Sequence, residues 1–229
     1  MSQIHHANWL QLRRLIPVLE RHGSMTTGEV LDYGCGTSPF RGLFSQSRRY
    51  HRVDREGIDD GVHVIDPRAP LPFEASYFDV IILARVLGDI PDQHHLLCDL
   101  HRVLMPGGRM LVFEAISYPQ HDLPDDYWRV LPNGLRWTAQ KAGLEVTELT
   151  YLGGYFTNIA LHVNVFMLGG LSRSRFFRPV ASALRACTNL TCAGLDAAFP
   201  RPVLATDYFA CLTKPAASSS TAVSTGPAS

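Results

Sequence analysis

The stretch that most constrains this chain is EVLDYGCGTSPF at residues 29–40. Apolar Val30 and Leu31 lead into Asp32, and a turn spaced by Gly34 and Gly36 follows. Glycine lacks the Cβ that would keep a ligand away from the backbone, and it adopts dihedral angles closed to other residues. The pattern predicts a strand, a tight loop and a helix that could hold a nucleotide-like cofactor. The alternative is that these glycines only turn the chain.

The residues after the glycines separate two classes of cofactor. A dinucleotide fold has a third glycine and free amides at the helix N-terminus, where the pyrophosphate binds. Here Thr37, Ser38 and Pro39 occupy that place, and proline has no N–H to donate to a phosphate. The sequence therefore favours an adenosine cofactor without phosphates.

Three later stretches add to the glycine loop: YHRVDRE at 50–56, DPRAPLPFEASYFDVIIL at 66–83 and HRVLMPGGRMLVFEA at 101–115. With these stretches in this order, the sequence resembles the class I S-adenosylmethionine-dependent methyltransferases, in particular those of type 11. The resemblance covers roughly residues 29–150. One departure is Ser38, which stands at the third glycine of the family's loop. The resemblance implies an α/β, Rossmann-like, doubly wound sheet of about seven strands with the last strand antiparallel. It also implies S-adenosyl-L-methionine as the cofactor.

Two aspartates follow predicted strands at positions suited to this cofactor. Asp54 lies 22 positions beyond Asp32, where an acid at the tip of the neighbouring strand accepts hydrogen bonds from ribose hydroxyls. The resemblance implies that Asp66 accepts a hydrogen bond from the adenine amino group. The alternatives are a solvated turn for Asp54 and a turn before Pro67 for Asp66. The full set of predicted cofactor-binding residues is Asp32, Tyr33, Gly34, Gly36, Asp54, Arg55, Asp66 and Ala84.

Composition limits the partners and the compartment. The 229 residues contain 21 Lys plus Arg and 21 Asp plus Glu, so no overall charge favours binding to a nucleic acid. The five cysteines form no CxxC pair and the N-terminus lacks a secretory signal, which indicates a cytoplasmic protein. His94, His95 and His101 share no metal-binding pattern with an acid. We expect no metal site.

The segment 116–137 follows directly after the predicted fifth strand and is rich in proline, aspartate and aromatic residues. It resembles a DYWRFTPxGL stretch of the same family through residues 126–129 and 132–135. We interpret it as a substrate lid above the cofactor. The predicted substrate-binding residues are His121, Tyr127, Trp128 and Arg129. The alternative is that the aromatic rings pack on the sheet and Arg129 pairs with Asp125 or Asp126.

The remaining segments predict the domain organisation. We expect an N-terminal helical cover (1–28, kinked or restarted at Pro17), the cofactor-binding core (29–152, with a short helix at 40–47), a helical insertion (153–204), a final core strand (205–214) and a disordered tail (215–229). The stretch 173–185 mixes arginines with Phe176 and Phe177. Such a stretch could contact an anionic lipid, a phosphorylated substrate or a membrane surface, or form a helical cover or dimer face.

The sequence thus predicts a methyltransferase acting on a small-molecule acceptor, apolar or aromatic, by in-line methyl transfer. We assign no catalytic residue, because alignment of the acceptor can supply most of the rate. His121 and Asp122 are candidates for a base, and the oligomeric state stays open. Two alternatives are a non-catalytic scaffold with the same fold and a nicotinamide-dependent oxidoreductase. The acceptor does not follow from the fold.

Overall fold

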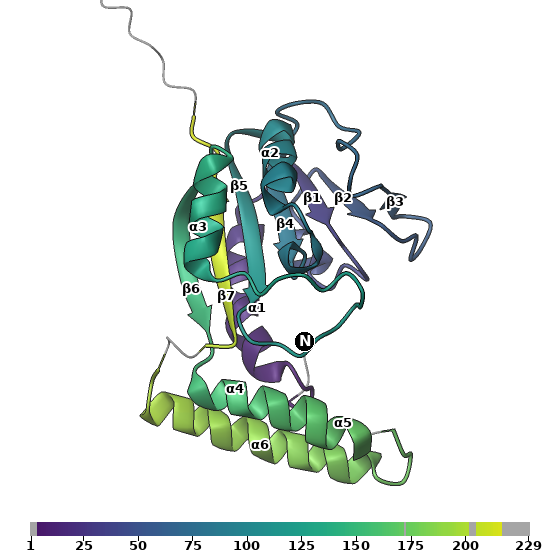
Figure 1. Cartoon of the computed structure of the whole chain (residues 1–229), viewed down its shortest axis with the longest axis vertical. Coiled ribbons are helices and arrows are strands. Elements are labelled where there is room, and N and C mark those ends of the chain that lie inside the picture. Colours follow the sequence, from purple (N-terminus) through teal and green to yellow (C-terminus); the bar gives the residue numbers. More distant parts are fainter. Residues whose placement is uncertain (1–3, 172, 202–204, 217–229) are drawn as a thin grey trace, which may run out of the picture.

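The computed structural model describes residues 4–171, 173–201 and 205–216. Its centre is a seven-stranded sheet with the strand order β3-β2-β1-β4-β5-β7-β6 (Figure 1). The strands are β1 Glu29–Tyr33, β2 Arg49–Asp54, β3 His63–Val64, β4 Phe78–Ala84, β5 Leu104–Ala115, β6 Glu145–Leu152 and β7 Asp207–Thr213. Strands β1 to β5 pair in parallel, and β7 is antiparallel to both β5 and β6. This confirms the predicted fold class.

Helices cover both faces of the sheet. Along β1 and β4, neighbouring side chains enter opposite cores: Val30 and Ile82 join one, whereas Leu31 and Ile81 join the other. The first core is closed by α1 Trp9–Ser24 and the 3-10 helix η1 Arg41–Phe44, the second by α2 Gln93–Val103 and α3 Pro132–Lys141. Because both faces are covered, the central strands contain runs of consecutive apolar residues, such as residues 30–31 and 80–83, and do not alternate between apolar and polar residues.

Two details of the helices differ from the sequence-based expectation. The helix expected at 40–47 is only the 3-10 turn η1, since this stretch contains Gly42, Ser45 and Ser47, which favour helix poorly. Helix α1 runs through Pro17 without restarting. Pro17 is exposed, so water can reach the carbonyl group that has lost its hydrogen-bond donor.

Between β6 and β7 the chain forms a separate layer of helices, which we call the helical layer. It consists of α4 Tyr155–His162, the π-helical turn η3 Val163–Met167, α5 Leu168–Leu171 and α6 Arg178–Ala198. The helical layer lies across the end of the molecule toward which the parallel strands point (Figure 1). None of the helices in the described ranges has the length and apolar character needed to cross a membrane. Most of the expected tail, from residue 217 on, lies outside the described residues.

Candidate cofactor and acceptor site

Two adjoining pockets lie at the carboxyl ends of β1, β2 and β4. The large pocket has a volume of about 630 Å³ and includes Tyr33, Asp54 and Asp66 in its lining. The small pocket has a volume of about 320 Å³ and includes Asp32 and Phe113. Gly34, Gly36 and Arg85 line both pockets. Ligands of open α/β folds bind at this edge of the sheet, and both volumes fall within the range of small-molecule sites.

The glycine loop needs its glycines for two different reasons. Gly34 has φ of 65°, and a Cβ added there would lie 2.6 Å from Val86 Cγ2. Gly36 has φ of 47°, but an added Cβ would meet no atom within 4 Å, so its backbone faces open space. Ser38, at the third glycine position, keeps a positive φ of 51°. Its hydroxyl accepts a hydrogen bond from Arg52 at 2.7 Å. Ser38 lines neither pocket, so this departure from the family pattern does not narrow them.

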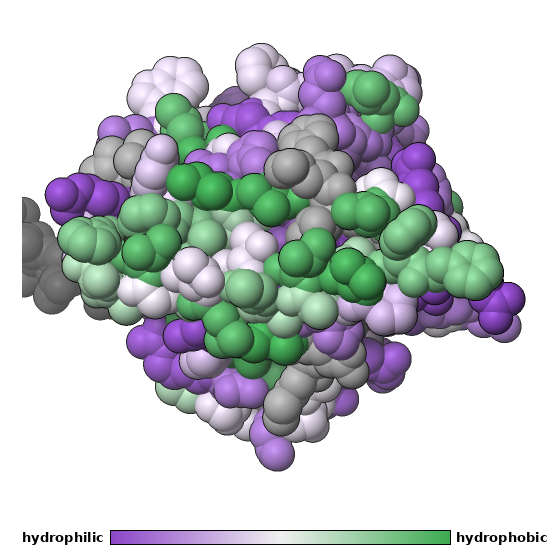
Figure 2. Space-filling model, turned by 90° about the horizontal axis from the view of Figure 1, so that it is seen from below, coloured by the Kyte–Doolittle hydropathy of each residue, from purple (hydrophilic) through white to green (hydrophobic). Residues whose placement is uncertain are grey.

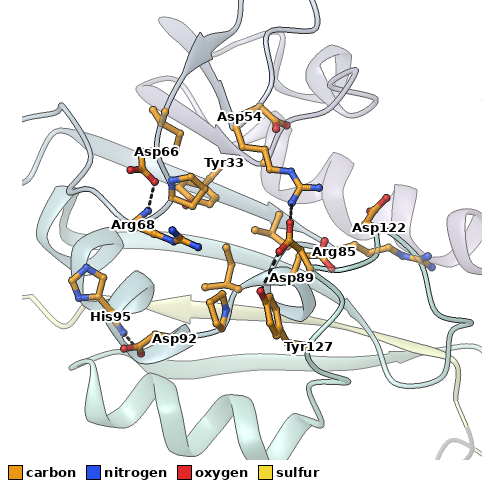
Figure 3. Close-up of a pocket in the computed structure, with 18 of the residues that line it drawn as sticks. Tyr33, Asp54, Asp66, Arg68, Arg85, Asp89, Asp92, His95, Asp122 and Tyr127 are labelled. Atoms are coloured by element: carbon orange, nitrogen blue, oxygen red, sulfur yellow. Dashed lines mark hydrogen bonds and ion pairs between the residues drawn. The ribbon is translucent and has the colours of Figure 1, made fainter.

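Asp54 and Asp66 offer carboxylates to the large pocket. Asp54 ends β2, and its two oxygens accept from the amides of Gly36 at 2.8 Å and Glu56 at 3.3 Å. Asp66 accepts from the Arg68 amide at 2.9 Å and so shapes its turn while also lining the pocket. A carboxylate oxygen can accept more than one hydrogen bond, which leaves room for ligand hydroxyl or amino groups. Figure 3 shows both carboxylates on the side of the pocket where Tyr33 lies, with Asp92, His95 and Tyr127 opposite.

Asp32 differs from these two aspartates because it is buried. Its Oδ2 accepts from the Tyr50 hydroxyl at 2.8 Å, and burial raises the pKa of its carboxyl group to about 6. It lines the small pocket together with Ala84. A buried carboxylate is stabilised by a nearby cation, so this position suits the amino group of an amino-acid moiety.

Arg85 lines both pockets. It is the first residue after β4 and has a positive φ of 61°, which is uncommon for a residue other than glycine and often marks a functional site. Its guanidinium group lies over the rings of Phe113 and Tyr118, at 5.1 and 4.5 Å from their centroids. One nitrogen donates to the buried Asp207 at 2.6 Å, and Nε has no partner among the described residues. The sequence-based site lacked Arg85, although its position at a strand end was a signal.

The sequence predicts a lid over residues 116–137, but the last part of this segment is helix α3, which begins at Pro132. The loop at 116–131, which we call the lid from here on, contributes Asp122, Asp125 and Tyr127 to the lining of the large pocket. The amides of Tyr127 and Trp128 both donate to the Gly88 carbonyl, and Arg55 donates to Asp125 at 3.0 Å. The Tyr127 hydroxyl donates to the other oxygen of Asp125 at 3.1 Å. Tyr127 and Arg55 both line the large pocket. The loop is therefore held against the core from two sides.

The other three residues predicted to bind substrate lie within the lid or on its outside. Arg129 donates to both oxygens of Asp126 and to the carbonyls of Tyr118 and Pro119. This pair, which the sequence offered as an alternative, lowers the pKa of Asp126 to about 2. Trp128 is half exposed and donates to the Ile90 carbonyl. His121, Trp128 and Arg129 line neither pocket, so their contact with a substrate stays a prediction.

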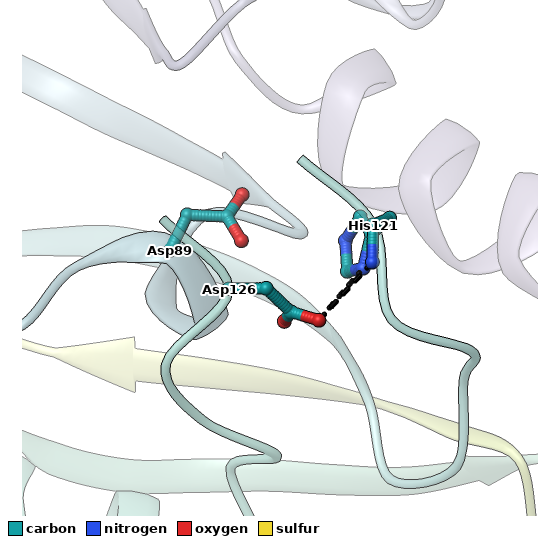
Figure 4. A group of neighbouring side chains, drawn as sticks. All are labelled: Asp89, His121 and Asp126. Carbon is teal, nitrogen blue, oxygen red and sulfur yellow. Dashed lines mark hydrogen bonds and ion pairs between the residues drawn. The ribbon is translucent and has the colours of Figure 1, made fainter. Parts of the chain in front are cut away.

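Asp89, His121 and Asp126 form a group whose ligand-type atoms all lie within 4.8 Å of one another (Figure 4). Such a set could in principle hold a cation. Arg129, however, already neutralises Asp126 through both carboxylate oxygens. His121 and Arg129 therefore pair with Asp126 within the lid, and the expectation of no metal site stays a prediction.

Comparison with known proteins places the chain in a family. Residues 5–149 match the model of a methyltransferase domain. A ubiquinone/menaquinone biosynthesis C-methyltransferase, UbiE, from Shewanella halifaxensis is 32% identical over 124 residues. That match covers 46% of this chain and 49% of the relative, so the similarity extends over about half of the relative's length.

Solved structures show the same fold at low sequence identity. The [4+2]-cyclase SpnF has a TM-score of 0.58 at 18% identity, covering 89% of this chain and 80% of the other. Phosphoethanolamine N-methyltransferase 2 of Haemonchus contortus, solved with S-adenosyl-L-methionine, has a TM-score of 0.56 at 18% identity, covering 93% and 56%. With the family model matching more than half of its length, the chain belongs to the S-adenosylmethionine-dependent class I methyltransferases.

Proposed function

We propose that this protein transfers a methyl group from S-adenosylmethionine to a small acceptor that has an apolar body and a polar substituent. The observation that carries the proposal is the pair of adjoining pockets that share Gly34, Gly36 and Arg85. One pocket holds the carboxylates suited to an adenosine, and the other is walled by apolar side chains. Two ligands bound in this way would meet at the end of β4.

Residues of both pockets fit the cofactor. In the large pocket, Asp54 is placed to accept from the ribose hydroxyls and Asp66 from the adenine amino group. The buried Asp32, which lines the small pocket two residues before the shared Gly34, would pair with the amino group of the methionine end. S-adenosylmethionine supplies a methyl group on a sulfonium sulfur that leaves without charge. The protein then needs no acid for the leaving group, and its main task is to hold the acceptor in line.

The other residues of the small pocket suit the proposed acceptor. Leu12, Phe40, Ala84 and Phe113 give it apolar walls. Gln11 also lines it, is 1% exposed, and has no partner for either amide atom among the described residues. A buried amide without a partner is costly, and a carbonyl or hydroxyl group of the acceptor would satisfy it. The Nε of Arg85 offers a second donor nearby.

The relatives support an acceptor of this kind. The UbiE proteins are named as C-methyltransferases of ubiquinone and menaquinone biosynthesis, and quinone precursors combine an aromatic ring with oxygen substituents. Neither His121 nor Asp122 lines the small pocket, so we still assign no catalytic base. The five cysteines are unpaired, which supports the proposed cytoplasmic location.

The first test is calorimetric titration of the purified protein with S-adenosylmethionine, S-adenosylhomocysteine and NAD. We expect micromolar affinity for the first two ligands and none for NAD. Asp54→Asn should reduce that affinity at least about 100-fold, because a charge-assisted bidentate contact is lost, without unfolding the protein. Asp60→Asn is the matched control, since Asp60 is exposed and lines neither pocket.

The outcomes separate the alternatives. Unchanged affinity in Asp54→Asn would show that the ribose assignment is wrong. A folded wild-type protein that binds neither sulfur ligand would favour the scaffold function, and one that binds NAD would favour the oxidoreductase. Binding without methyl transfer to any phenol or quinol tested would instead indicate another reaction on this fold, as the cyclase among its structural neighbours shows can occur.

A further inference from the structure

The outward side of α6 is unusual for a helix in water. Its exposed residues recur every three or four positions and so form one stripe. Beyond Arg178 and Pro179 in the first turn, they are Val180, Ala183, Leu184, Cys187, Leu190, Thr191, Gly194, Ala197 and Ala198. The stripe extends for about 27 Å and contains no charged residue. A solvated surface helix normally carries charged and polar residues on this side.

The inward side of the same helix is polar. Asn189 is fully buried and donates to the carbonyls of Ile4 and His6, and it accepts from Asn164 at 2.9 Å. Asp196 is 4% exposed and accepts from the amides of Phe156 and Thr157 at the start of α4. Asn189 and Asp196 thus have their partners inside the protein, whereas Leu184 and Leu190 of the same helix face outward.

The turn before α6 extends this apolar surface and adds positive charge. Phe176 is 84% exposed and Phe177 54%, and they lie among the exposed residues Arg173, Arg175 and Arg178. Residues 155–201 contain five arginines and a single acid, the buried Asp196. Seen from below, the apolar residues form a band across the molecule with hydrophilic residues along both sides (Figure 2).

We propose that this surface, made by the outward stripe of α6 and the turn at 173–178, binds to an anionic lipid bilayer. The apolar stripe would lie in the plane of the interface, the two phenylalanines would enter the acyl boundary, and the arginines would contact lipid phosphates. A second copy of the chain is a poorer partner, because the helical layer offers no exposed acid to meet these arginines.

The small pocket lies where a membrane-bound protein could take its acceptor from the bilayer, an inference that rests on the proposed function. Helix α1 packs against the helical layer through Leu10, which contacts Ala160 and Cys192. Asn8, Gln11 and Leu12, from the same end of α1, line the small pocket. The pocket therefore lies just behind the helical layer. An apolar acceptor dissolved in the bilayer would reach it over a short distance.

The test is flotation of the full-length protein with vesicles of phosphatidylcholine alone and with vesicles containing about one third phosphatidylglycerol. We expect binding to the anionic vesicles that weakens at high salt. Phe176→Ser combined with Phe177→Ser should lower the partition coefficient at least about tenfold. Replacing Arg173, Arg175 and Arg178 with Gln should remove the preference for anionic vesicles, at about fivefold per arginine. Trp137→Ser is the matched control, since Trp137 is 63% exposed on α3.

Parallel titration with S-adenosylmethionine shows that each variant is folded, and it keeps this proposal separate from the proposed function. The proposal is overturned if the wild-type protein floats with neither kind of vesicle, or if Trp137→Ser loses binding as strongly as the double phenylalanine variant. A stable dimer in sedimentation velocity that Leu190→Ser disrupts would also overturn it, because the same surface would then be an interface between two copies.

Discussion

The sheet and the helical layer distribute polarity in opposite ways. In the sheet, Val30 and Leu31 are buried on opposite faces, and Asp54 and Arg85 stand at strand ends beside the pockets. In the helical layer, Asn189 and Asp196 are buried, whereas Leu184 and Leu190 face outward. The sheet therefore has its apolar side chains covered within the protein. The helical layer leaves an apolar surface exposed, which we propose is covered by a lipid bilayer.

Each region also contains a buried carboxylate that accepts from backbone amides at a turn. Asp196 joins α6 to the start of α4, and Glu114 of β5 accepts from Val86 and Leu87 just after β4. The two acids allow the regions to be perturbed separately. If the helical layer is an addition to a self-sufficient core, a change in one region should leave the other intact.

The largest effect is expected from Asp196→Ala. The substitution leaves two amides at the start of α4 and the Thr157 hydroxyl without their acceptor, at a cost of about 4 kcal/mol in unfolding free energy. Limited proteolysis should then cut within residues 155–201, while calorimetry still shows binding of S-adenosylmethionine.

Asp92→Ala is the matched control for this prediction. Asp92 is the exposed N-cap of α2 and, within the part of the chain that the structure describes, its side chain accepts only from the His95 amide, at 3.0 Å, so its loss should cost about 1 kcal/mol. Asp92 also lines the large pocket, so it is a control for stability only. Equal destabilisation by the two variants would show that Asp196 contributes no more than an exposed N-cap. Loss of cofactor binding in Asp196→Ala relative to wild type would mean that the core and the helical layer fold as one unit.

The core carboxylate predicts a pH dependence. Burial raises the pKa of Glu114 from 4.5 to about 7. Between these values the folded protein keeps a proton that the unfolded chain releases. The unfolding free energy should therefore fall as pH rises from 4.5 to 7, with a contribution of about 3 kcal/mol from this group. Urea unfolding across this range measures the slope.

Glu114→Gln removes the titrating group while retaining an oxygen for the two amides. Its unfolding free energy should depend less on pH in this window, and the difference from wild type should grow as pH rises. Asp126, with a pKa of about 2, affects stability only below this range. Two parallel curves would show that Glu114 does not titrate as its burial implies.

The core could be predicted because its signals are local. Gly34 and Gly36 have the positive φ angles that their turn requires, Asp54 ends its strand, and the apolar run Phe78–Ala84 forms the strand covered on both faces. Each feature follows from a few consecutive residues, since it depends on backbone geometry and strand burial.

The rest depends on contacts between distant segments. The role of Arg85 needs Asp207, which is 122 positions away and comes beside it only through the antiparallel pairing of β5 and β7. The polar interior of the helical layer needs Asn189 to meet Ile4. From the sequence, Arg129 could either bind the substrate or pair with an aspartate of its own loop. Only the fold shows that its partner is Asp126.

The smallest expected effect concerns the lid, where a core residue and a loop residue meet. Arg55 and Asp125 form an ion pair at 3.0 Å with side chains 40% and 43% exposed, so Asp125→Asn should change the unfolding free energy by less than about 1 kcal/mol. Its effect should appear in cofactor release, which we expect to become several-fold faster at low salt and to match wild type at high salt, where the pair is screened. Stopped-flow fluorescence measures this rate.

Asp122→Asn is the control for this prediction. It removes the same charge from the same loop and pocket lining without touching the Arg55 pair, so its release rate should stay close to that of wild type. Equal acceleration in both variants would assign the effect to the net charge of the pocket and not to a closed lid.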